Sequence, residues 1–131
     1  MKGIIILIIM SWLGFLIVSL IVPVVLLVSV PLLRWVGQDP SLRFGLLGYR
    51  TSLSRSSEEN WHEGNMYAAK VWLCIGIALV VISLAISFIT VRISSADRSV
   101  LLTVMVLVQA LLAVLTIVPV ELHLRHFDSR E

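Results

Sequence analysis

The chain has 131 residues, of which 59% are hydrophobic and only 14% charged, and its mean hydropathy is +1.03. A domain of this length cannot hide so much apolar surface in a core of its own, so the composition excludes an ordinary soluble fold and indicates an integral membrane protein. The net charge of +2 gives no sign of nucleic-acid binding. Cys74 is the single cysteine, which excludes an intramolecular disulfide, and we expect it to pack as a small apolar side chain.

Three apolar runs predict three transmembrane helices, at residues 3–33, 71–91 and 100–120. In lipid these runs must be helices, because otherwise only a closed barrel satisfies the backbone, and barrel strands alternate in hydrophobicity. The first run is longer than one crossing needs and too long for the apolar part of a signal peptide, so we expect an uncleaved, tilted span. Pro23 removes a hydrogen-bond donor within it and predicts a kink.

The second and third runs are separated only by residues 92–99, which predicts an antiparallel helical hairpin. Asp97 or Ser99 is placed to cap the start of the third helix, and Pro119 with the polar tail 121–131 is expected to close it.

Polar and small residues inside the spans indicate helix contacts. Ser83 and Ser87, with Gly76 and Ala85 nearby, would permit close approach of a neighbouring helix. Gln109 is expected to form an interhelical hydrogen bond, and a place in a pore or ligand pocket is the alternative. The runs contain no acidic or basic residue, which argues against a proton relay or an ion path through the bilayer.

Basic residues are distributed unequally between the two predicted sides of the membrane. This asymmetry favours a cytoplasmic position for loop 34–70 and the C-terminus, with the N-terminus outside. The side with the N-terminus carries Lys2, Arg92 and Arg98, and the other side carries Arg34, Arg43, Arg50, Arg55, Lys70, Arg125 and Arg130.

The loop 34–70 has two halves of different character. Residues 34–48 are punctuated by glycine and proline with apolar residues between them, which favours a segment lying on the bilayer surface. The second half predicts a helix that starts at a capping box of Ser56 and Glu59. This helix either runs continuously into the second span or bends near Gly64. One face of it carries Trp61, Asn65, Ala68 and Trp72, and an interfacial aromatic belt would account for both tryptophans.

Nine residues of this loop form a pattern: Gly48, Tyr49, Arg50, Thr51, Glu58, Glu59, Trp61, Asn65 and Lys70. The pattern resembles the signature of the SdpI-type bacterial membrane proteins, in which Gly-aromatic/aliphatic-Arg-Thr-Pro precedes Glu-Glu-x-Trp, a polar residue and Gly-Lys. Ser52 stands in place of the family's proline and Ala69 in place of its glycine. One span before the motif and two after it resemble the short form of the family, which lacks the extra spans of longer members.

The resemblance implies an all-α integral membrane protein of the bacterial cell membrane that acts in immunity or resistance. The family's namesake protects a toxin-producing bacterium from its own secreted, membrane-active killing peptide, and it also draws a transcriptional repressor to the membrane. The implied partners are membrane lipid and a secreted peptide toxin or another membrane protein, with an oligomer possible and no cofactor. The implied binding residues are Gly48, Tyr49, Arg50, Thr51, Glu58, Glu59, Trp61 and Asn65.

Arg50 carries two hypotheses. Its guanidinium could form a bidentate pair with Glu58 or Glu59 and pin the loop to the next helix. Alternatively, Arg50, Glu59, Trp61 and Asn65 could form a polar pocket for a peptide, a lipid headgroup or a partner helix.

Two further interpretations have less support in the sequence. Glu59 with His62, and His123 with His126, each place two donors on one helix face and could meet at a metal, although solvated histidines are the expected outcome. A membrane-surface hydrolase using Glu59 and His62 is another alternative, but no nucleophile elbow, HExxH or phosphate loop is present. An accessory subunit of a larger membrane complex is the main alternative to immunity, and we expect no enzyme.

Overall fold

The apolar runs form long helices in the computed structural model, which describes residues 1–130 and their side chains except those of residues 6–10 and 95. The described residues contain no strand. In chain order the elements are α1 (Lys2–Gly37), the 3₁₀ helix η1 (Pro40–Phe44), α2 (Glu58–Ile89), the 3₁₀ turn η2 (Thr90–Arg92), α3 (Ser95–Leu115) and α4 (Ile117–Asp128).

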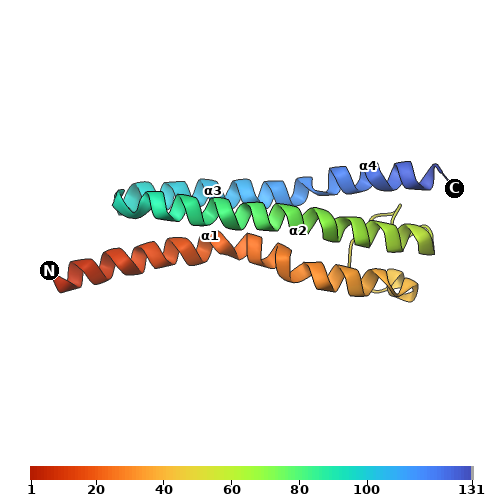
Figure 1. Cartoon of the computed structure of the whole chain (residues 1–131), viewed down its shortest axis with the longest axis horizontal. Helices are drawn as coiled ribbons and strands as arrows, with labels where there is room; N and C mark the ends of the chain where they lie inside the picture. Colours follow the sequence, from red (N-terminus) through yellow and green to blue (C-terminus); the bar gives the residue numbers. More distant parts are fainter. Residues whose placement is uncertain (131) are drawn as a thin grey trace.

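Three helical stretches are long and apolar enough to cross a membrane, which confirms the predicted all-α membrane fold. These stretches are Ser11–Gly37, Glu58–Arg92 and Ala96–Asp128. They lie side by side as three rods, with the N-terminus and the α2–α3 turn at one end and residues 38–57 and the C-terminus at the other (Figure 1). The predicted hairpin is therefore present. Which side of the membrane each end faces stays a prediction.

The N-cap of α2 lies one residue after the expected cap, and the N-cap of α3 lies a few residues before it. The N-cap of α2 is Ser57, whose Oγ accepts from the Asn60 N–H at 3.0 Å, so the expected cap at Ser56 is wrong by one residue. The N-cap of α3 is Ser94, which accepts from the Asp97 N–H at 3.2 Å. The expectation that Asp97 or Ser99 caps this helix is therefore wrong, because Ser94 already supplies the oxygen.

α2 runs from the loop into the bilayer without a break at Gly64, so of the two alternatives the continuous helix is confirmed. The third helix differs from expectation, because it is interrupted at Thr116 and resumes as α4 through most of the predicted polar tail. Pro119 explains the interruption, since it has no N–H for the Leu115 carbonyl one turn earlier.

Pro23 leaves a backbone carbonyl free at a point where the three rods meet. It has no N–H for the Ser19 carbonyl, and α1 bends along its length (Figure 1). The free Ser19 carbonyl accepts from Ser83 Oγ of α2 and from Gln109 Nε2 of α3, each at 3.1 Å. Gln109 Nε2 also donates to Ser83 Oγ at 2.9 Å. The expected interhelical hydrogen bond of Gln109 is thus confirmed, and it joins three helices at the proline site.

The small residues of α2 pack against α1, with one exception. Gly76, Ser83 and Ser87 are buried, and a Cβ on Gly76 would lie 2.7 Å from Leu27 Cδ2. Ala85 is exposed and takes no part in this contact, contrary to expectation. Cys74 is also exposed, so its predicted role as a packed apolar side chain is wrong.

At the hairpin end Arg98 closes the end of α2. Its guanidinium is buried and donates to the carbonyl oxygens of Thr90 (3.0 Å), Val91 (3.2 Å) and Ile93 (3.1 Å). A cation at a helix C-terminus satisfies carbonyls that have no intrahelical donor and interacts favourably with the helix dipole.

Candidate functional site at the loop end

The family-like motif lies at the loop end of the molecule, in a region that we call the cap: residues 33–69 together with α4. The contacts that hold the cap together start at the turn formed by Gly48. Gly48 has φ +101°, and a Cβ there would lie 2.7 Å from Asn65 Oδ1 and 2.8 Å from Val36 Cγ1. Only glycine fits this backbone conformation without strain, so Gly48 lets the loop lie directly against α1 and α2.

Asn65 fastens the loop to α2. Its side chain is fully buried, and Oδ1 accepts from the Tyr49 N–H at 2.7 Å while Nδ2 donates to the Trp61 carbonyl at 2.9 Å. Water cannot replace these hydrogen bonds at a buried site, so this position needs a side chain with both a donor and an acceptor.

Trp61 and His62 fasten the end of α1 to α2. The Trp61 Nε1–H donates to the Val36 carbonyl at 2.9 Å, and His62 Nδ1 lies 2.9 Å from the Gly37 carbonyl oxygen. These carbonyls belong to the last turn of α1 and lack intrahelical donors. Trp61 is 0% exposed, so its assignment to an interfacial aromatic belt is wrong. Trp72 is partly buried and donates to Thr116 Oγ1 at 3.0 Å.

Arg50 binds backbone carbonyls, and its predicted pair with Glu58 or Glu59 is absent among the described contacts. Its Nη2 donates to the Arg43 carbonyl at 3.0 Å, and its Cζ lies 5.6 Å from the centre of the Trp61 ring. Two further carbonyls, of Leu42 and Leu47, accept from Nη1 at 3.3 and 3.4 Å. The guanidinium therefore binds carbonyls of η1 and of the loop after it, while both glutamates stay exposed at the start of α2.

The segment after Arg50 is closed by reciprocal bonds. Ser54 Oγ accepts from the Thr51 N–H at 2.8 Å, and Thr51 Oγ1 accepts from the Ser54 N–H at 3.1 Å. Ser54 Oγ also donates to the Tyr49 carbonyl at 3.0 Å. Ser52, which stands where the family has proline, is exposed within this turn. These bonds hold the turn without the proline ring.

Three side-chain bonds hold α4 against the rest of the cap. They are Tyr49 Oη to Glu121 Oε2 at 2.7 Å, Asn60 Nδ2 to Asp128 Oδ1 at 2.9 Å, and His123 Nε2 to Glu63 Oε1 at 2.7 Å. Burial and the acceptor on Glu121 raise the pKa of Tyr49 well above its usual value, so its hydroxyl stays a donor at neutral pH. No local pattern in the sequence predicts these contacts, because each joins residues at least 60 positions apart.

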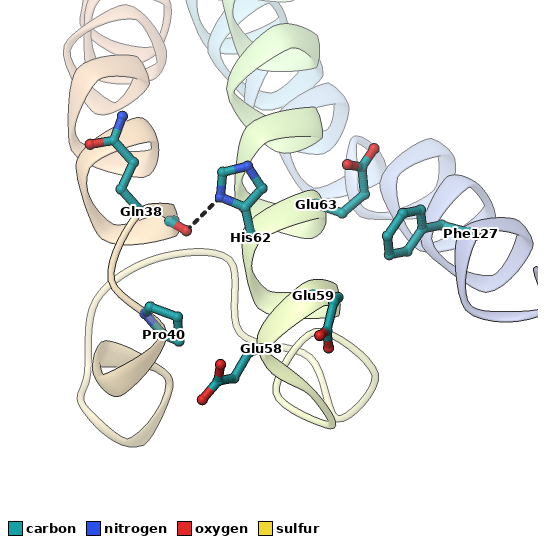
Figure 2. Close-up of a pocket in the computed structure, with 8 residues that line it drawn as sticks. Gln38, Pro40, Glu58, Glu59, His62, Glu63 and Phe127 are labelled. Carbon is teal, nitrogen blue, oxygen red and sulfur yellow. Dashed lines mark hydrogen bonds between the residues drawn. The ribbon is translucent and has the colours of Figure 1, made fainter. Parts of the chain in front are cut away.

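A groove of about 360 Å³ opens on the outer surface of the cap (Figure 2). Its lining residues come from the end of α1, the start of η1, the first turns of α2 and the end of α4: Gly37, Gln38, Pro40, Glu58, Glu59, His62, Glu63 and Phe127. Glu58 and Glu59 are the motif residues on this surface. The structure therefore separates the predicted pocket, with Glu59 in the groove and Trp61 and Asn65 in the interior.

Of the two residue pairs predicted as metal or hydrolase groups, Glu59 and His62 lie together, but the histidine pair does not join them. Glu59 and His62 do line one groove, but His123 bonds to Glu63 and stacks on Tyr67 with ring centres 3.8 Å apart. Within residues 1–130 no group of three or more His, Cys, Asp or Glu side chains is placed to hold a metal ion. The groove lining contains no Ser, Thr or Cys.

Fold and site together define a multi-pass α-helical membrane protein whose loop and last helix form a hydrogen-bonded cap. A sequence model of the SdpI/YfhL protein family matches residues 43–120, which is more than half of the chain. The chain therefore belongs to the SdpI/YfhL family, as the motif indicated. No curated protein and no solved structure matches it.

Proposed function

We propose that this protein is a membrane immunity protein that protects a bacterial cell against a secreted, membrane-active killing peptide. Membership of the SdpI/YfhL family supports this role, because immunity is what the family's namesake provides. The observation that carries the proposal is the cap, in which the family motif orders a 20-residue connection, residues 38–57, into a fixed surface. A flexible linker between two spans would need no such network.

The recognition surface that we propose is the groove, with the motif's interior residues in a positioning role. Tyr49, Trp61 and Asn65 are buried and could meet a partner only if the cap opened. Glu58 and Glu59 are exposed and line the groove beside His62. Binding or masking of the peptide is the mechanism that this arrangement supports, since the apolar runs offer no charged residue for energised export.

The test is survival of a sensitive bacterial host that expresses only this chain and is challenged with the killing peptide against which the family's namesake protects. We expect the wild-type chain to protect and a double Glu58→Gln, Glu59→Gln variant to lose protection at equal membrane abundance. Ser52→Ala, an exposed loop change outside the groove, is the matched control and should protect fully.

Two results would overturn this assignment. Full protection by the double variant would remove the groove from the mechanism. No protection by the wild-type chain, together with copurification of a stoichiometric membrane protein in mild detergent, would replace immunity with the accessory-subunit alternative.

The cytoplasmic placement of the cap is part of the proposal, because it rests on the excess of Lys and Arg at that end. Reporter fusions after residue 130 and within residues 52–56 should both report the cytoplasm. A periplasmic signal from either fusion would invert the orientation.

A further inference from the structure

A second groove lies between α2 and α4, on the side of α2 turned away from α1. It encloses about 290 Å³ and is lined by Tyr67, Lys70, Val71, Cys74, Ile75 and Pro119. Residues Asn65 and Gly76 of α2 face α1, and Cys74 is about half a turn away from Gly76 around the helix. This groove is thus separate from the groove beside Glu58 and Glu59.

The break between α3 and α4 places Pro119 along one wall of this second groove. On the opposite wall, the Tyr67 ring stacks on His123 of α4, with ring centres 3.8 Å apart and an angle of 4° between the rings. His123 is itself bonded to Glu63. These two contacts join α2 to α4 beside the groove.

The groove crosses the level where α2 passes from polar to apolar sequence. Tyr67 and Lys70 lie on the polar side of this boundary, and Val71, Cys74 and Ile75 lie on the apolar side. Lys70 is exposed, and none of the hydrogen bonds or ion pairs among the described residues involves its ammonium group. Like Glu58 and Glu59, Lys70 is a residue of the family-like motif that takes no part in the hydrogen bonds of the cap, and it lies outside the groove that those two glutamates line.

We propose that this groove binds a glycerophospholipid, with one acyl chain along the apolar wall and the phosphate on the ammonium group of Lys70. An apolar groove that opens into the hydrocarbon region accepts a chain without losing polar contacts. A lysine at headgroup level supplies a compact positive charge for the phosphate, and basic pockets between transmembrane helices bind lipid headgroups in this way. The proposal does not depend on the immunity function.

The experiment is native mass spectrometry of the purified full chain in detergent with added phosphatidylglycerol, phosphatidylethanolamine or diacylglycerol of the same acyl chains. We expect both phospholipids to be retained and diacylglycerol to be lost, because diacylglycerol has no phosphate. Lys70→Gln should weaken phospholipid retention about fivefold, the weight of one basic side chain at a membrane surface. Lys70→Arg should restore it.

Two controls separate a specific site from general lipid contact. Arg34→Gln removes an exposed basic residue at the same end of the molecule but outside the groove, and it should leave retention unchanged. Cys74→Trp should fill the apolar wall and reduce retention of both phospholipids, whereas Ile77→Trp, on an exposed position outside the groove, should not.

Several outcomes would overturn the site. Equal loss from Lys70→Gln and Arg34→Gln would mean that only the general charge of this end matters. Retention of diacylglycerol as strong as that of the phospholipids would exclude phosphate recognition. If Lys70→Gln fails to fold, the Cys74→Trp and Ile77→Trp pair decides the question, and equal retention by these two variants would reject the groove.

Discussion

The two halves of this molecule are held together by different means. In the membrane half, the three helices meet at small residues and at a few polar contacts. At one of these, Ser83 and Gln109 share the carbonyl that Pro23 leaves free on α1. In the cap, side chains hydrogen-bond the connection to α2 and α4 through Tyr49, and Trp61 of α2 is hydrogen-bonded to the end of α1. The same helices pass through both halves, so the difference in how they are held together comes from their surroundings, which are lipid in one half and the loop in the other.

The difference shows why the family motif lies where it does. In lipid, apolar side chains gain little by leaving the hydrocarbon for a helix contact, so close packing and a few hydrogen bonds suffice. In the cap, ordering the loop costs conformational entropy, and the packing of so short a segment does not offset this cost. Buried hydrogen bonds contribute the remaining stabilisation. The motif residues that make those bonds, Tyr49, Arg50, Thr51, Trp61 and Asn65, are all buried or half-buried, whereas the exposed Glu58 and Glu59 make none of them.

The largest expected effect is that of Gly48→Ala. A positive φ costs a residue with a side chain about 1–3 kcal/mol, and the new Cβ would also overlap Asn65 and Val36. We expect the free energy of unfolding in mixed micelles to fall by more than about 3 kcal/mol. Gly14→Ala is the matched control in the membrane half, since its Cβ would meet nothing within 4 Å. Equal stability of the two variants would contradict the account of this turn.

The next effect compares one buried amide in each half. Asn65→Leu leaves the Tyr49 N–H without its acceptor, and we expect a loss of about 2 kcal/mol. Gln109→Leu should cost only about 0.6 kcal/mol, a typical value for hydrogen bonds between membrane helices, because Ser83 still donates to the Ser19 carbonyl. Denaturant titration of both variants measures the two losses. A larger loss for Gln109→Leu would reverse the comparison.

Charge reversal at Arg50 tests whether carbonyls or carboxylates hold its guanidinium. We expect Arg50→Glu to cost about 1.5 kcal/mol, because charged hydrogen bonds to the η1 carbonyls are lost. Adding Glu59→Arg should not rescue stability, and the coupling energy from a double-mutant cycle should stay below about 0.5 kcal/mol. A rescue of full stability would restore the ion pair expected from the sequence.

The smallest effect concerns the Tyr49 hydroxyl and has a defined pH window. Its pKa is raised in the folded protein by burial and by Glu121, so the neutral form stabilises the fold fully below the unfolded value of about 10. As pH rises above 10 the unfolded chain ionises first, and stability should fall toward the folded pKa. Unfolding curves between pH 8 and 11 should show this fall. Tyr49→Phe should lower the free energy of unfolding by about 1 kcal/mol below pH 10, and its stability should fall less steeply above pH 10. An equally steep fall in the variant would exclude Tyr49 as the cause.

The features that the sequence predicts correctly depend on local properties of the chain. Run length and hydropathy located the three membrane-crossing helices, and the start of α2 was predicted to within one residue because a serine cap acts on its own first turn. Gln109 was assigned to a helix contact because a polar amide in lipid must find a partner.

The features that the sequence does not predict depend on which segments meet in space. Arg50 and Glu59 are close in sequence, yet the carbonyls of η1 lie nearer the guanidinium once the loop folds back. Trp61 has the composition of a membrane-interface residue, but the end of α1 covers it. Similarly, the bond from Tyr49 to Glu121 could not be anticipated, because it requires α4 to continue past Pro119.

The bonds that Tyr49 and Asn60 make with α4 can form only late in synthesis. Tyr49 leaves the ribosome 72 residues before its partner Glu121, and Asn60 leaves 68 residues before Asp128. The first two helices can enter the membrane and pair while the cap is still open. The contacts of α4 with the cap form only when the last helix has been made, so the motif residue Tyr49 gains its partner Glu121 at the end of translation.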